Sequence, residues 1–281
     1  MSFNDQLIQS IETQGSSVCV GLDSRYDLLP SFIKSGVSVS EAIFSFNKEI
    51  ISSTHKYAAA YKSNVSFYAA FGQEGLEALQ LTNTFLKENF PRIPRLADCK
   101  RSEMGESVNM VKMEIFDWLN FNCVMVTPWF GFDTVKDYLQ DDSRGVCVYV
   151  HDSNPSAPEL QGLKLENGQF LYEYLCDQIV HKWNVSKNIF IEVGATYPEA
   201  LRNSRKIVGD DMVILTAGVG KQGGKIEDLK GQFGTNNARF LVNSSRGIIF
   251  AGKEKSTSKE YFDEVSKTAL ALRDELLTIA E

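Results

Sequence analysis

Short apolar runs recur along the chain, and amphipathic stretches separate most of them. Several of the runs are continuous rather than alternating, which is typical of parallel strands covered on both faces. Each run predicts one buried strand. The eight predicted strands are Val18–Leu22, Ala58–Tyr61, Arg95–Asp98, Cys123–Val126, Val146–Val150, Ile189–Val193, Met212–Leu215 and Arg239–Val242.

The amphipathic stretches predict helices between the strands. They cover Glu41–Thr54, Glu74–Glu88, Gly105–Asn120, Phe170–Lys182, Pro198–Val208 and Ser258–Ile279, and Met1–Gln14 is also amphipathic. Alternating strands and helices indicate parallel βαβ units. Eight such units in 281 residues favour closure rather than an open doubly wound sheet. The prediction is an α/β protein, a single (β/α)8 TIM barrel with an N-terminal helix, forming one domain over residues 1–281.

The amino-acid composition excludes several classes of function. The formal net charge of −7 at pH 7 argues against general nucleic-acid binding, which requires a basic face. No apolar run approaches the roughly 20 residues of a membrane span, and the polar N-terminus does not resemble a signal peptide. The five cysteines show no C-x-x-C spacing and the three histidines no metal-ligand pattern, which predicts free thiols and no metal. We therefore expect a cytoplasmic protein that binds neither nucleic acid nor membrane.

Polar residues follow seven of the eight apolar runs. In a barrel of this kind the functional groups lie at the C-terminal ends of the strands, so these residues should meet at one mouth. The strand ends carry Asp23, Lys62-Ser-Asn64, Asp98-Cys-Lys100, His151-Asp-Ser153, Glu192, the segment Ala217–Gly224, and Asn243-Ser-Ser245-Arg246.

The segment Asp98–Glu103 carries the most chemical information. Because strand side chains alternate, Asp98 and Lys100 should face one side of the sheet. One interpretation is a salt bridge that only seals the barrel, although such a pair is costly to desolvate unless it is well matched. Lys62, on the neighbouring strand, adds a second cation. Two lysines among carboxylates suit proton transfer and carbanion chemistry.

A glycine-rich segment, Gly218–Gly224, follows the seventh strand, and Ser245-Arg246-Gly247 follows the eighth. The first could be a flexible turn. Barrel phosphate sites, however, are frequently built from these two loops, where backbone N–H groups and an arginine fork meet the anion. The two segments together predict a phosphate site.

These motifs, in this order, resemble the orotidine 5'-monophosphate decarboxylase family, especially its longer bacterial subgroup. The resemblance runs nearly end to end. It rests on Cys19-Val-Gly-Leu-Asp23, Tyr61-Lys62 leading to Phe67, Asp98-x-Lys100-Arg101, Ser153-Asn-Pro155, Val193-Gly-Ala-Thr-Tyr-Pro-Glu199, Gly218-Val-Gly-x-Gln222-Gly-Gly and Ser244-Ser-Arg246-Gly247.

The resemblance implies decarboxylation of orotidine 5'-monophosphate to UMP without a cofactor. Asp98 would lie against the substrate carboxylate, and Lys100 would stabilise and protonate a carbanion at C6. Asp23 and Lys62 would hold ribose hydroxyls, and Ser153 would contact the pyrimidine edge. The 5'-phosphate would be held by Gln222, Arg246 and the N–H groups around Ser245.

Two positions depart from the family pattern. Ala217 stands where the subgroup usually has Pro before Gly-Val-Gly. Glu103 stands where the family has an aspartate that reaches the partner's site, and its carboxylate extends about one C–C bond further. Ser107 stands where a Thr or Ser from the partner meets the ribose. The resemblance thus implies a homodimer with shared active sites. Glu103 keeps two alternatives open: a related enzyme acting on another phosphorylated substrate, with or without Mg²⁺, and a UMP-binding paralogue with weakened catalysis.

Overall fold

The computed structural model describes residues 1–219 and 223–280. Eight parallel strands close into a barrel in chain order, with β1 paired to both β2 and β8, so the predicted (β/α)8 fold is confirmed. The strands are β1 (Val18–Gly21), β2 (Ala60–Asn64), β3 (Arg95–Arg101), β4 (Cys123–Val126), β5 (Gly145–His151), β6 (Ile189–Val193), β7 (Ile214–Thr216) and β8 (Phe240–Ser244).

Every predicted apolar run contains part of an observed strand, and two runs, Cys123–Val126 and Ile189–Val193, agree with it residue for residue. The main differences lie at the C-terminal ends. β2, β3 and β8 continue into polar residues that an apolar criterion does not count, ending at Asn64, Arg101 and Ser244. Backbone pairing continues there because it does not depend on side-chain polarity. Several of these polar side chains, such as Lys62, Asn64 and Lys100, line a cavity rather than the core.

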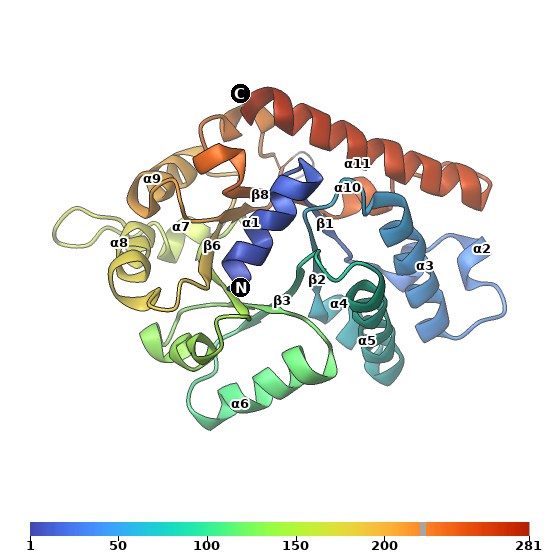
Figure 1. Ribbon diagram of the computed structural model, residues 1–281, viewed down its shortest axis with the longest axis horizontal. Helices are drawn as coiled ribbons and strands as arrows, with labels where there is room; N and C mark the ends of the chain where they lie inside the picture. Colours follow the sequence, from blue (N-terminus) through green and yellow to red (C-terminus); the bar gives the residue numbers. More distant parts are fainter. Residues whose placement is uncertain (220–222, 281) are drawn as a thin grey trace.

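The helices surround the barrel (Figure 1). The long ones are α1 (Phe3–Gln14), α3 (Val39–Thr54), α5 (Gly72–Asn89), α9 (Pro198–Val208) and α11 (Ser258–Ala280). Two predicted helices are divided: α6 (Glu106–Lys112) continues as the π-helical η2 (Met113–Trp118), and α8 (Leu171–Gln178) as η5 (Ile179–Trp183). The shortest elements carried no periodic signal: α2 (Ser31–Lys34), α4 (Val65–Ala69), α7 (Ala157–Leu160), α10 (Arg246–Ile249), η1 (Tyr26–Leu28), η3 (Gly131–Thr134), η4 (Lys136–Gln140), η6 (Ile226–Leu229) and η7 (Thr235–Asn237).

The N-terminal helix closes one end of the barrel. Ser2 caps α1 through a reciprocal hydrogen-bond pair with Asp5, which satisfies backbone donors at the helix start. Phe3 then stacks on Phe190 with ring centroids 5.9 Å apart, and Ser10 donates to the Ala59 carbonyl just before β2. Figure 1 shows α1 lying across the barrel. Because α1 covers the N-terminal ends of the strands, a ligand site can open only at their C-terminal ends.

Buried residues form two layers, as the alternation of strand side chains requires. Inward-facing residues such as Leu96, Met125 and Leu241 fill the barrel with α1, and the outward-facing ones pack under the surrounding helices. All five cysteines are free, as predicted, and four of them are buried. Among the described residues no helix is both long and apolar enough to cross a bilayer.

Candidate active site

A cavity of about 730 Å³ opens at the C-terminal ends of the strands. Its volume is in the range of small-molecule sites. Seven of the ten residues that the sequence analysis singled out line it: Asp23, Lys62, Asp98, Lys100, Ser153, Ser245 and Arg246. Glu103 and Ser107 lie elsewhere, and Gln222 falls outside the residues that the structure describes.

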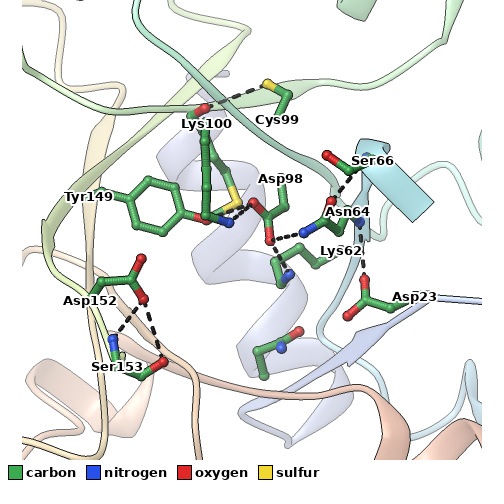
Figure 2. A network of polar contacts seen from close by, with 12 residues as sticks. Asp23, Lys62, Asn64, Ser66, Asp98, Cys99, Lys100, Tyr149, Asp152 and Ser153 are labelled. Carbon is green, nitrogen blue, oxygen red and sulfur yellow. Dashed lines mark hydrogen bonds and ion pairs between the residues drawn. The ribbon is translucent and has the colours of Figure 1, made fainter. Parts of the chain in front are cut away.

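Asp98 is the centre of the charged groups in the cavity (Figure 2). The Lys62 ammonium lies 2.8 Å from its Oδ2, and the Lys100 ammonium lies 2.6 Å from its Oδ1. The Lys62 and Asp98 side chains are only 5% and 6% exposed, whereas that of Lys100 is 44% exposed. Both lysines line the cavity, and Lys100 is the more exposed of the two.

Charge pairing outweighs burial in both buried groups. Burial acts to raise the pKa of the Asp98 carboxyl, but Lys62 and Lys100 outweigh it and hold that pKa below its usual range. Burial acts to lower the pKa of Lys62, but Asp98, with Asp23 and Glu192, raises it above its ordinary value. Both groups are thus charged at neutral pH, and the array is a fixed pattern of charges before any ligand binds.

The backbone at Lys100 is irregular. Its φ is 49°, in the left-handed region that non-glycine residues rarely adopt, and the β3–β4 register shifts between Ala97 and Arg101. Such a conformation costs about 1–3 kcal/mol and persists where the surroundings impose it. The predicted placement of Asp98 and Lys100 on one side agrees with the structure, but a bulge rather than regular alternation brings Lys100 to the cavity.

Tyr149 is a cavity residue that was not predicted from the sequence. It lies within the apolar run of β5, where the sequence pattern predicts an aromatic residue of the core. The alternation of side chains along β5 was the one signal that could have placed it inward. Its hydroxyl donates to Asp98 Oδ1 at 2.7 Å, and the Lys100 ammonium lies 4.8 Å from its ring centroid. Burial, then the charge of Glu192 and Asp98, raises the pKa of Tyr149, so it remains a donor.

Asp23 and Ser153 line the cavity beyond the charged array. The Asp23 carboxylate accepts a hydrogen bond from the Asn64 backbone N–H at 3.1 Å, which ties the end of β1 to the end of β2. The Ser153 backbone N–H donates to its neighbour Asp152 at 2.7 Å, and the Ser153 carbonyl accepts from Thr196 at 2.9 Å. Both positions are therefore held by contacts between different strand ends.

Two glycines near strand ends, Gly21 and Gly194, allow neighbouring chain segments to approach closely. A Cβ on Gly21 would lie 1.8 Å from the Ser245 hydroxyl, and one on Gly194 would lie 2.7 Å from the Ser153 backbone. Any larger residue would displace these cavity-lining residues. The glycines of Gly-Leu-Asp23 and Val-Gly-Ala-Thr196 thus have a packing role that their motifs alone did not reveal.

Arg246 and Ser245 form the part of the cavity after β8. Ser245 follows the strand directly, and Arg246 begins α10 with its side chain exposed at the cavity. Gly218 and Val219, from the start of the glycine-rich segment, line the same cavity. A guanidinium and a hydroxyl in one exposed wall can bind an anion.

Glu103 and Ser107 line a separate surface pocket with Arg101 and Glu114. The Glu103 carboxylate lies 3.6 Å from the Arg101 guanidinium and accepts the Ser102 N–H at 3.0 Å. Arg101 Nη2 also donates hydrogen bonds to both carboxylate oxygens of Glu114. Glu103 therefore does not reach the cavity of its own chain.

The closed parallel barrel, with this Lys–Asp–Lys array at its mouth, defines a (β/α)8-barrel enzyme. The profile of the family described as orotidine 5'-phosphate decarboxylase / HUMPS matches residues 16–261. The chain belongs to this family.

Individual relatives agree with this assignment. The orotidine 5'-phosphate decarboxylase of Christiangramia forsetii is 34% identical over 278 residues, covering 99% of this chain and 98% of the relative. That of Natronomonas pharaonis is 35% identical over 277 residues, covering 98% of each. Among solved structures, the OMP decarboxylase of Leishmania donovani has a TM-score of 0.82 at 26% identity, covering 100% of this chain and 99% of that one.

Proposed function

We propose that this enzyme removes CO2 from orotidine 5'-monophosphate to give UMP, the last step of de novo pyrimidine nucleotide synthesis. The observation that carries the proposal is the Lys62–Asp98–Lys100 array, which lies in the same cavity as Arg246 in a chain of this family. The charged array suits a reacting carboxylate, and Arg246 suits a phosphate.

In the proposed reaction the bond between C6 and the carboxyl carbon breaks, and its electron pair stays on C6. The Lys100 ammonium gives its proton to C6, CO2 leaves, and the neutral amine recovers a proton from solvent. Asp98 would lie against the substrate carboxylate and disfavour the ground state, whereas the two lysines paired with it would stabilise the developing negative charge. No cofactor takes part in this scheme.

The remaining cavity residues would bind the nucleotide. Asp23 and Lys62 contact ribose hydroxyls, and Ser153 contacts the pyrimidine edge. Arg246 and Ser245 hold the 5'-phosphate together with Gln222. Binding energy from this remote phosphate helps to position the reacting carbon, as is usual for enzymes that act on phosphorylated substrates.

The proposal includes a homodimer in which Glu103 and Ser107 enter the partner's cavity. Both residues are separated from their own cavity and lie beside exposed apolar side chains. Met104, Met110 and Met113 are 50–60% exposed on and before α6 and at the start of η2, and Trp129, after β4, is 66% exposed. Met110 lines the same surface pocket as Glu103 and Ser107, and exposed apolar surface is a feature of protein–protein contacts.

The deciding experiment is a spectrophotometric assay of purified enzyme with orotidine 5'-monophosphate, run with and without chelator. We expect loss of the orotate absorbance at a rate that chelator does not change. Inhibition by chelator would favour a metal-dependent relative that acts on another phosphorylated substrate. Tight UMP binding by calorimetry without turnover would indicate a binding protein that has lost catalysis.

A further inference from the structure

Glu192 is a buried acid in the cavity that the proposed mechanism does not use. It lies on β6, two residues after Phe190, and so faces the barrel interior. The residue is only 4% exposed, yet it lines the same cavity as Asp98 and Lys100. Its Oε2 is buried without a hydrogen-bond partner among the described residues.

The surroundings of Glu192 oppose a negative charge. Lys62, the cation that most favours its ionised form, already pairs with Asp98, and Asp98 and Asp152 both add negative potential. Burial first, and then Asp98, raises the pKa of Glu192 to about 8, against the opposing influence of Lys62. The ionisable groups that face it from the neighbouring strands and their ends are Cys19, Lys62, Asp98, Lys100, Cys147, Tyr149 and Asp152.

Packing does not account for a glutamate at this position. Inward-facing positions of the barrel around it hold apolar residues such as Met125, Leu215 and Leu241. A carboxyl group buried without a partner destabilises a fold, and an apolar side chain of similar size would not. An unpaired buried polar group that borders a cavity is instead a natural contact for a ligand.

We propose that Glu192, as a neutral carboxylic acid, donates a hydrogen bond to the substrate carboxylate and so makes the site specific for a carboxylated nucleotide. The inference rests on the proposed function, because it assigns a partner to a group of that substrate. Near Asp98 the substrate carboxylate meets a like charge, and a neutral acid is a donor that can be placed there without adding a further charge. Departing CO2 is a weaker acceptor, so the contact contributes to binding of the substrate and not of UMP.

The test compares wild type with Glu192→Gln and Glu192→Val. For each protein, the KM for orotidine 5'-monophosphate and the inhibition constant of UMP are measured at pH 7 and pH 9. At pH 7 we expect the Val variant to raise the KM about 10-fold or more and to leave the UMP constant unchanged. The Gln variant keeps an N–H donor and should restore most of the affinity. Between pH 7 and pH 9 the KM should rise further in wild type than in the Gln variant.

Thr134→Val is the matched control, because the Thr134 hydroxyl is also buried, has no partner in the part of the chain that the structure describes, and lies outside the cavity. Equal weakening of substrate and UMP, or an unchanged KM in the Val variant, overturns the inference while the proposed function stands. Wild-type enzyme without turnover overturns the proposed function instead. In that case calorimetry gives the Kd of the same two nucleotides directly, and the same comparison decides the role of Glu192.

Discussion

Lys100 and Tyr149 meet at a single carboxylate oxygen. The Lys100 ammonium and the Tyr149 hydroxyl both bind Asp98 Oδ1, at 2.6 and 2.7 Å, and the ammonium lies 4.8 Å from the tyrosine ring centroid. The ring face attracts the cation while the hydroxyl fixes the anion. Tyr149 therefore holds both members of the ion pair in place, although it carries no charge of its own.

Lys100→Ala should remove catalysis without removing nucleotide binding. The variant lacks the proposed proton donor, so we expect kcat to fall by roughly 10²-fold to 10⁴-fold. UMP affinity, measured by calorimetry, should change only a few fold. Lys136→Ala is the control, since Lys136 is an exposed lysine paired with Asp133. A variant at Lys100 that retained most of its activity would show that another group protonates C6.

Tyr149→Phe should lower kcat by about 10-fold or more, because a hydrogen bond to a charged group contributes about 1.5–3 kcal/mol. The change leaves the ring beside Lys100 but removes the donor to Asp98. Steady-state kinetics measure the effect. Tyr138→Phe is the control because the Tyr138 hydroxyl is buried without a partner within residues 1–219 and 223–280. Equal effects of the two substitutions would mean that the Tyr149 hydroxyl only supports packing.

Arg246→Ala should mainly raise KM. The guanidinium would bind the phosphate equally in the ground and transition states, so its loss weakens binding by roughly 10-fold to 100-fold with little change in kcat. Arg202→Ala, on the exposed face of α9, serves as the control. A fall in kcat at unchanged KM would contradict the assignment of Arg246 to the phosphate.

Mixing two inactive variants tests whether Glu103 acts across a dimer interface. Lys100→Ala and Glu103→Ala should each be inactive alone. In a mixed dimer one cavity carries both defects and the other carries none, so random exchange should restore about a quarter of wild-type activity. Absence of recovery in a mixture shown by light scattering to be dimeric would place Glu103 outside the partner's site. Glu103→Asp should keep or increase activity.

Glu192 should make stability depend on pH. Its folded-state pKa of about 8 lies above the ordinary value of 4.5, so on raising the pH the unfolded chain releases this proton first. The stabilising contribution is complete below about pH 4.5 and is lost as the pH rises to about 8. The free energy of unfolding of Glu192→Gln, relative to that of wild type, should therefore increase by up to a few kcal/mol between pH 5 and pH 8. One pKa unit corresponds to about 1.4 kcal/mol.

Urea unfolding at several pH values measures this gain. The pKa of Asp98 is lowered, so Asp98 stays ionised between pH 5 and pH 8 in both proteins and adds no pH dependence there. Glu254→Gln is the control, because the Glu254 side chain is 83% exposed. A constant stability difference between wild type and Glu192→Gln across this pH range would mean that Glu192 is ionised in the folded protein at neutral pH.

The sequence by itself determined the barrel and the membership of most of the cavity. Strand and helix periodicity is a local property of the chain, and parallel closure then brings all C-terminal strand ends to one mouth. Asp23, Lys62, Asp98 and Arg246 could therefore be assigned to one cavity although they are far apart along the chain. The same local signal could not place strand ends where pairing continues through polar residues, as in β3.

Only the tertiary structure decided how these groups meet. The left-handed backbone at Lys100, the reach of Tyr149 to Asp98 and the isolation of Glu192 depend on the register of strands that are distant in sequence. Apolar patterning treats Tyr149 as core and Glu192 as one more polar strand end. Which donor reaches which oxygen, and whether an acid keeps its proton, follows from distances and burial that exist only once the barrel has closed.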